Sequence, residues 1–347
     1  MFFRSRREAP PAMTLEGVLG PNTVIDDAEG LKVEAPQALC VVDGSRLLIS
    51  SGNAVLAISR WGDQPQPWCV FDQPVTALSA SPAGTVGIGL ADGSFSVRDR
   101  AGSVLAGWGR PESLASVTDC LFVSEDEIAL VDSGYRAGED ILSRAPWDET
   151  GRGQVVMINR NGAMRRLAAG LHCPMGLARD ADGELIVSLL ERAAIVDLAG
   201  KVRQPGFPAY LGRVRATESG YLLSCLSRRD PLIEFLKTEA EFVAEMKATI
   251  DPRHWISPRA HPEFSHDFPI ELGATRLFGE IKPWAPSFSY GLVIATDTAF
   301  IPTGSAHSRA NGARHAISDT VEWNGDVIAV SRASGEVLRF SFAREAA

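Results

Sequence analysis

The stretch Pro174-Met-Gly-Leu-Ala-Arg-Asp-Ala-Asp-Gly-Glu-Leu-Ile-Val-Ser-Leu, residues 174–189, decides the fold. It reads as a short apolar strand, a turn rich in Asp and Gly, and a second apolar strand. A proline followed within four residues by leucine also opens such segments at Pro36, Pro74, Pro111 and Pro208, and the first three of these are 38 and 37 residues apart. A period of about 40 residues with strand–turn–strand content is typical of a β-propeller, in which each repeat is one blade. The sequence therefore predicts an all-β fold.

Six blades account for nearly the whole chain. We expect them at residues 36–60, 75–108, 114–158, 176–204, 210–302 and 316–340. Because a closed ring of repeats is one cooperative unit, residues 17–347 are predicted to be a single six-bladed β-propeller, and residues 1–16 an extension. The sixth blade shows three strands, and we expect residues 17–26 to supply the fourth and so remove an exposed edge.

Two insertions interrupt the repeats, at residues 135–153 in blade three and at about residues 230–286 in blade five. Asp230 followed by Pro231 is typical of a helix start, and apolar residues then recur with helical spacing. We expect one amphipathic helix, and its many glutamates favour packing over the propeller rather than on a membrane surface. The His-, Pro- and aromatic-rich residues 253–286 predict an ordered loop or lid.

The composition limits which partners the protein is expected to bind and in which cellular compartment it is expected to lie. The formal net charge of −9 argues against nucleic acid and anionic membranes, which would repel the chain. No apolar run approaches the roughly 20 residues that span a bilayer, and the first residues lack the apolar core of a signal peptide. Five scattered cysteines without a Cys-x-x-Cys pair fit buried free thiols in a reducing cytoplasm. We expect a cytoplasmic protein with a small-molecule ligand, no cofactor and no metal; the oligomeric state stays open.

Several segments resemble the strictosidine synthase-like proteins. Val117-Thr-Asp-Cys-Leu-Phe-Val-Ser-Glu-Asp-Glu-Ile-Ala-Leu-Val-Asp-Ser-Gly is similar to that family's third blade, and Gly170-Leu-His-Cys-Pro-Met-Gly-Leu-Ala and Gln204-Pro-Gly-Phe-Pro-Ala-Tyr-Leu match further motifs in order. The resemblance covers roughly residues 36–340. It implies a six-bladed propeller in a superfamily that also contains calcium-dependent lactonases of the gluconolactonase and paraoxonase types.

The chain departs from those lactonases at the axial positions where they hold calcium with carboxylate and Asn oxygens. Thr118, Met175 and the pair Ala209-Tyr210 stand where the family pattern has Asn or Asp, whereas Asp119 is kept. A hard cation needs about six oxygen ligands, so the resemblance does not carry a calcium site over to this chain.

The resemblance implies that strictosidine synthase itself uses one Glu of the sixth blade as its catalytic carboxylate. In this chain His315 occupies that position. The carboxylate that would catalyse the condensation reaction of that enzyme is therefore missing. Imidazole titrates near pH 6.5 and can act as an acid or base, so we predict His315 as the catalytic group, with Asp119 orienting it across the axis. The alternative is a hydrogen-bonded structural histidine.

The remaining candidate residues would form the substrate pocket. They are Arg314, Tyr135, Asp132, Met175, Tyr210 and His307. Arginine and histidine suit a carboxylate or phosphate on the ligand, while Met175 and Tyr210 predict an apolar, aromatic floor. The leading interpretation is a metal-independent hydrolase or lyase acting on a lactone, ester or related metabolite. The alternative is a ligand-binding or scaffold propeller without catalysis.

Overall fold

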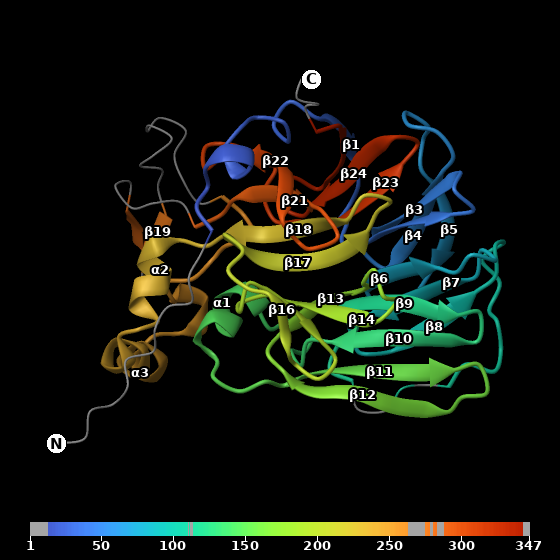
Figure 1. The fold of residues 1–347 in the computed structure, drawn as a ribbon, viewed down its shortest axis with the longest axis horizontal. Helices are drawn as coiled ribbons and strands as arrows, with labels where there is room; N and C mark the ends of the chain where they lie inside the picture. Colours follow the sequence, from blue (N-terminus) through green and yellow to red (C-terminus); the bar gives the residue numbers. More distant parts are fainter. Residues whose placement is uncertain are drawn as a thin grey trace.

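The computed structural model describes residues 13–109, 111, 114–262, 275–277, 280–282 and 288–342. Six antiparallel sheets are arranged around a central axis as the blades of a propeller, which confirms the predicted fold class (Figure 1). Five sheets have four strands; the second blade has three, extended by an isolated bridge between Arg98 and Val104. Each blade packs its buried faces on its two neighbours, so the ring has one continuous set of apolar layers.

The strands follow one another from the axis outward in each blade. In the first three blades they are β2 (Leu39–Val42), β3 (Arg46–Ser51), β4 (Ala54–Ile58), β5 (Gln66–Val70); β6 (Val75–Ala80), β7 (Val86–Leu90), β8 (Phe95–Arg98); and β9 (Asp119–Ser124), β10 (Glu127–Asp132), β11 (Gly153–Asn159), β12 (Met164–Leu171). In the last three they are β13 (Pro174–Arg179), β14 (Leu185–Leu189), β15 (Ala194–Asp197), β16 (Val202–Gln204); β17 (Ala209–Ala216), β18 (Tyr221–Arg228), β21 (Gly291–Thr296), β22 (Pro302–Ser308); and β23 (Ile317–Trp323), β24 (Asp326–Ser331), β25 (Glu336–Phe340), with β1 (Glu29–Lys32).

The turn between β13 and β14, at residues 180–183, shows why these segments fold as hairpins. The Asp180 carboxylate accepts hydrogen bonds from the backbone N–H groups of Asp182 and Glu184, and Gly183 has a φ of 84°, a left-handed conformation that glycine adopts without strain. The strand that follows, β14, is buried along its whole length, as its continuous apolar run predicts. Blade four therefore forms where the sequence placed it.

The ring closes differently from the expectation. The fourth strand of blade six is β1, Glu29–Lys32, which pairs antiparallel with β25; residues 17–26 do not form it. Gly17–Leu19 is instead a short 3₁₀ helix, η1, and Asp26 accepts a hydrogen bond from the Ser308 hydroxyl at 2.6 Å. Polar anchoring of this segment on blade five, rather than strand pairing, brings β1 into register.

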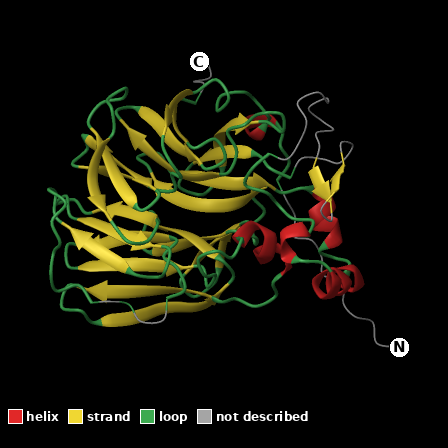
Figure 2. Cartoon of the chain, turned by 180° about the vertical axis from the view of Figure 1, so that it is seen from behind, coloured by secondary structure: helices red, strands yellow, loops and turns green. Residues whose placement is uncertain are grey.

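The insertions gather at one end of the ring (Figures 1 and 2). The first contains α1 (Ile141–Arg144) and η2 (Ala145–Trp147); the second contains α2 (Pro231–Leu236), α3 (Ala240–Thr249), η3 (Pro252–His254) and the short paired strands β19 (Thr275–Leu277) and β20 (Glu280–Lys282). Asp230 caps α2 through the Leu232 N–H, as predicted. Two helices replace the single expected one. Much of the predicted lid, including His266, lies outside the described residues.

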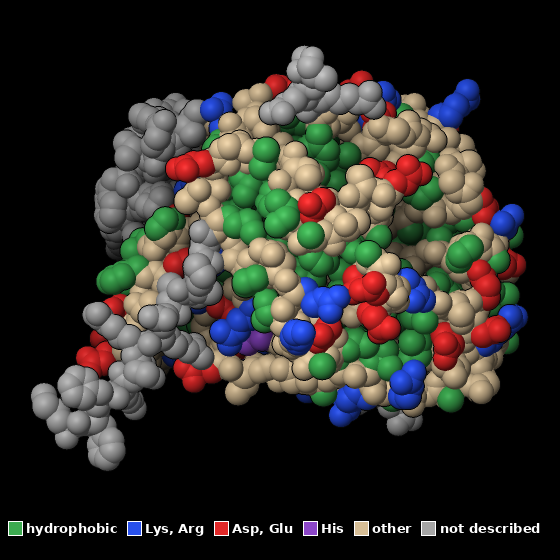
Figure 3. Space-filling view, in the orientation of Figure 1, with side chains coloured by type: hydrophobic (Ala, Val, Ile, Leu, Met, Phe, Trp, Pro, Cys, Tyr) green, Lys and Arg blue, Asp and Glu red, His purple; other side chains and the backbone are tan. Residues whose placement is uncertain are grey.

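The surface carries acidic and basic side chains side by side rather than one extended field of either sign, on the face that Figure 3 presents. All five cysteines are free, and burial raises the pKa of the Cys40 thiol to about 12, which makes it unreactive. Within the part of the chain that the structure describes, no helix has the length and apolarity needed to cross a membrane.

Candidate functional site

Two arginines of the inner strand β17 occupy the propeller axis. Arg213 is 6% exposed and donates hydrogen bonds to backbone carbonyls that precede or begin the inner strands of four other blades. Its acceptors are Gln37 at 2.7 Å, Ser318 at 2.9 Å, Thr118 at 2.7 and 3.1 Å, and Thr76. One guanidinium thus satisfies carbonyls of blades one, two, three and six, and fixes these blades to one another at the centre of the ring.

Arg215 lies next along the axis, between two fully buried carboxylates. It donates two hydrogen bonds to Asp119, at 2.9 and 3.0 Å, and two to Asp319, both at 2.9 Å. Burial is the largest influence on Asp119 and raises its pKa, while Arg215 and Arg213 act in the opposite direction. The pairing raises the pKa of Arg215 well above its usual range, so this guanidinium stays charged. Two arginines and two aspartates leave the centre of the axis electrically neutral.

The two aspartates also tie neighbouring blades together in the same way. Asp119, on β9, accepts a hydrogen bond from the Leu177 N–H of β13, and Asp319, on β23, accepts one from the Leu39 N–H of β2, both at 2.9 Å. Gly176 lets β13 approach β17 closely, because a Cβ there would lie 2.6 Å from the Arg213 Cα. Asp119 is therefore held on all sides by main-chain and arginine donors.

These residues do not fit a calcium ion. The axial carboxylates already bind Arg215, and the carbonyls that face the axis already bind Arg213. Among the described residues there is also no group of three or more His, Cys, Asp or Glu side chains placed to hold a metal ion. The cationic groups at the centre of this ring are supplied by the chain itself.

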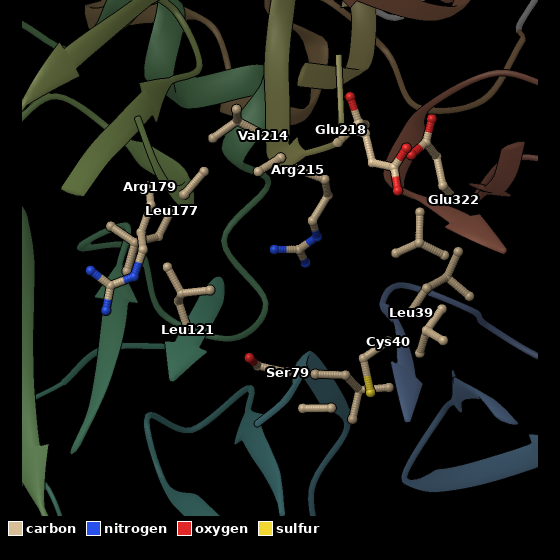
Figure 4. Close-up of a pocket in the computed structure, with 17 residues that line it drawn as sticks. Leu39, Cys40, Ser79, Leu121, Leu177, Arg179, Val214, Arg215, Glu218 and Glu322 are labelled. Atoms are coloured by element: carbon tan, nitrogen blue, oxygen red, sulfur yellow. The ribbon is translucent and has the colours of Figure 1, made fainter. Parts of the chain in front are cut away.

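A cavity of about 530 Å³ opens on the axis at the end opposite the insertions (Figure 4). We call this end the cavity end, because its lining comes from the later residues of the inner strands; the end where these strands begin, next to α1–α3, is the insertion end. The lining is mostly apolar, and includes Leu39, Cys40, Val41, Leu78, Ala80, Leu121, Leu177, Val214, Ala216 and Val321. Arg215 projects into the middle of the cavity.

Three charged side chains join Arg215 in this lining. Glu218 and Glu322 lie on one side of the cavity and Arg179 on the opposite side (Figure 4). Burial, and then the negative charge of Glu218, raise the pKa of Glu322. Arg179 donates hydrogen bonds to the carbonyls of Gly183 and Val123, which hold it at the rim.

The two tyrosines predicted for the substrate pocket are buried at the insertion end. Tyr210 is fully buried and donates a hydrogen bond to Glu234 of α2 at 3.0 Å; Tyr135 is 2% exposed and donates to Asp148 at 2.7 Å. Burial raises the pKa of both phenols well above the usual range. Met175 packs against the same apolar cluster. These side chains anchor the insertions to the ring.

His315 is fully buried between blades five and six. Its Nδ1 lies 3.0 Å from the Ser289 hydroxyl and its Nε2 lies 2.8 Å from the Arg309 carbonyl oxygen. Burial lowers the pKa of His315 to about 4, so the ring is neutral at cellular pH. The predicted pairing with Asp119 is not formed, because Asp119 is bonded to the axial arginines.

The other predicted ligand-binding residues also have structural partners. His307 lies between Tyr290 and Ser305, at 3.1 and 2.9 Å, and burial lowers its pKa to about 4. Arg314 donates hydrogen bonds to three carbonyls of residues 25–28 and pairs with Glu336, which fastens the segment that closes the ring.

Asp132 accepts hydrogen bonds from the N–H groups of Ala115, Ser116 and Gly134. The structure therefore does not bring the predicted site residues together in one pocket.

Five charged residues of the axis and the cavity were not predicted from the sequence: Arg213, Arg215, Asp319, Glu218 and Glu322. A signal was present: two arginines alternate on an otherwise apolar inner strand, and Ser318-Asp319 repeats Thr118-Asp119 at the same place of another blade. Charge at buried strand positions indicates paired groups, and a shared position in two blades indicates that they face one axis.

Comparisons with known proteins support the architecture. No protein-family model and no curated protein sequence matches the chain. The solved structure of a putative gluconolactonase matches with a TM-score of 0.51 and 13% identity, over 91% of this chain and 93% of that one.

The Swd1 β-propeller domain of Myceliophteria thermophila matches with a TM-score of 0.50 and 12% identity, over 90% of this chain and 99% of that one. At such identity these likenesses show the propeller fold alone. The resemblance to strictosidine synthase-like proteins stays a prediction.

Proposed function

We propose that this propeller binds a small organic molecule in the axial cavity at its cavity end. The observation that carries the proposal is the cavity itself: about 530 Å³, lined mainly by apolar side chains, with a few charged groups converging on it. Small-molecule sites in proteins have this size and this combination of apolar walls and few polar groups. The insertion end offers a smaller cavity of about 380 Å³, lined by polar and charged residues of the insertions such as Asp140, Arg144 and Arg253.

Hydrolysis of a lactone or ester is the second candidate function, and the Glu218–Glu322 pair favours it. A carboxylate whose pKa is raised by burial and by a neighbouring carboxylate is a stronger base than an ordinary glutamate, which favours general-base catalysis. The gluconolactonase-like fold is consistent with this chemistry without showing it. His315 has no step in this proposal, since both of its ring nitrogens have partners, and no step passes through a metal or cofactor.

The reaction we propose is a direct attack by water. Glu322 takes a proton from water while the water oxygen bonds to the carbonyl carbon of the ligand, which gives a tetrahedral oxyanion. Arg215 has five N–H donors and uses four on the aspartates, so one remains to stabilise that oxyanion. The C–O bond to the leaving oxygen then breaks, and Glu322 returns the proton to it.

Binding is tested by filling the cavity. Ala216 is exposed and lines the cavity, so Ala216→Phe inserts a ring there without disturbing the core; Val70→Phe on the exposed outer strand β5 is the matched control. With γ-butyrolactone, phenyl acetate and n-butanol as probes, we expect ligand-observed NMR to detect binding to the wild type and to Val70→Phe but not to Ala216→Phe. Equal binding to all three proteins would place the ligand elsewhere and overturn the proposal.

Catalysis is tested on the same probes by acid release. Glu322→Gln keeps the shape of the side chain and removes the base, so hydrolysis is expected to fall by about 10²–10⁴-fold while binding is retained. Wild-type protein that binds γ-butyrolactone or phenyl acetate without accelerating its hydrolysis would leave the binding proposal standing and exclude the hydrolysis of these two esters.

A further inference from the structure

We propose that the ligand of the axial cavity is a small organic cation with an apolar body, whose ammonium group is bound by Glu218 and Glu322. This inference rests on the proposed binding function and names the chemical class of its ligand. It follows from the charges left over at the mouth of the cavity once every ion pair and hydrogen bond of its lining is assigned.

The two glutamates lie close together on one side of the cavity (Figure 4). Neither Glu218 nor Glu322 makes a hydrogen bond or ion pair within the part of the chain that the structure describes. Each lies within the other's electrostatic reach, because the charge of Glu218 is among the causes that raise the pKa of Glu322. Like charges in one site repel, and a bound cation would relieve that repulsion.

The arginines of the cavity are committed to other groups. Arg215 has two carboxylates of its own, Asp119 and Asp319, which balance the charges of Arg215 and Arg213. Arg179 lies across the cavity from the glutamates and donates to two backbone carbonyls. The mouth therefore carries an excess of negative charge on the side of Glu218 and Glu322, although arginines stand nearby.

The rest of the lining selects the body of the ligand. Leu39, Leu121, Leu177 and Val321 belong to the walls, so an alkyl or aryl group would bury its surface against apolar side chains while the ammonium stays at the mouth. A metal cation does not suit this site, because two exposed carboxylates are too few ligands for it and the walls would displace its water.

The experiment compares three probes of one size that differ in charge: n-butylammonium, n-butanol and butyrate. Their affinities for the full-length protein are measured by NMR titration at low ionic strength, where exposed charges are least screened. We expect n-butylammonium to bind at least about tenfold more tightly than n-butanol, and butyrate most weakly.

Variants test whether Glu218 and Glu322 cause the preference for n-butylammonium over n-butanol. The double variant Glu218→Gln, Glu322→Gln should bind n-butylammonium no better than n-butanol, with n-butanol affinity unchanged, whereas Glu241→Gln on the exposed face of α3 should behave as wild type. n-Butanol or butyrate binding as tightly as n-butylammonium, with loss of all binding in Ala216→Phe, would overturn the cationic class and keep the cavity as a binding site. No binding of any probe would overturn both.

Discussion

The two ends of the propeller axis differ in what their residues are used for. At the insertion end, Tyr210 and Tyr135 are hydrogen-bonded to carboxylates of the insertions, and Arg213 to backbone carbonyls. At the cavity end, an apolar space remains and two glutamates have no partner among the described residues. Chemistry-bearing residue types thus gather where they serve the architecture, and the space for a ligand lies where the sequence shows mostly Leu, Val and Ala.

The largest loss of stability is expected when Arg213, at the centre of the ring, is replaced. Replacing Arg213 by Met removes the donors to four blades and leaves the axial carboxylates with one cation, which should lower the free energy of unfolding by about 3–5 kcal/mol. Chemical denaturation measures it. Arg60→Met, on a highly exposed arginine, is the control. A change below about 1 kcal/mol would show that the centre of the ring does not depend on this residue.

The buried histidines predict a loss of stability in acid. Burial lowers the pKa of His307 and His315 from 6.5 to about 4, so the folded state favours the neutral rings. Their contribution is fully present above about pH 6.5 and is lost as the pH falls toward 4, by up to about 3 kcal/mol for each ring.

The variant His315→Gln separates this effect from that of the carboxylates. Denaturation midpoints measured between pH 7 and 4 should fall less steeply in the variant than in the wild type. Parallel curves would mean that folding does not lower the pKa of His315.

A smaller change in stability, at Tyr210, tests whether the residues of the insertion end only hold the insertions on the ring or also bind ligand. Tyr210→Phe removes the hydrogen bond to Glu234 and should cost about 1 kcal/mol of stability, while n-butanol still binds at the cavity end. Thermal unfolding and NMR titration of one sample measure both. Loss of ligand binding without loss of stability would move the site to the insertion end and reverse the comparison.

The smallest effect on stability is expected at the mouth of the cavity. Glu218→Gln should change the free energy of unfolding by less than about 0.5 kcal/mol, yet it should shift the pKa of Glu322 downward because a repelling charge is removed. An NMR titration of the side-chain carboxyl resonances follows this pKa. With Glu241→Gln the pKa should stay where it is in the wild type.

The sequence predicted the blades well where strands are apolar and turns carry Asp and Gly, as in β13–β16. It failed where a strand is polar or at an edge. β5 begins Gln66-Pro67, which does not read as a strand, but an outer edge strand tolerates proline because one side of it needs no donor. β22 runs to Ser308, past the predicted end of blade five at residue 302, and the polar residues Ser305, His307 and Ser308 do not read as a strand.

The candidate site was harder to predict than the fold. His315 and Tyr210 were expected at a pocket because their positions in the repeat resemble functional positions. The partners they find are distant in the chain or lie in irregular segments: Ser289 and Arg309 for His315, and Glu234 of an insertion for Tyr210. The cavity is made by residues from all six inner strands, and only the closed ring reveals which of them meet.

Because β1 pairs with β25, the ring cannot close until the last blade has been synthesised. Glu29 pairs with Arg339, so β1 is synthesised before the other strands of all six blades and waits for the last strand of blade six. Synthesis proceeds at about 5–20 residues per second, so β1 stays without its partner for many seconds while the other blades form. During that interval the growing propeller is an open crescent with two free edges, and Arg314, which holds residues 25–28, is added only after the first five blades.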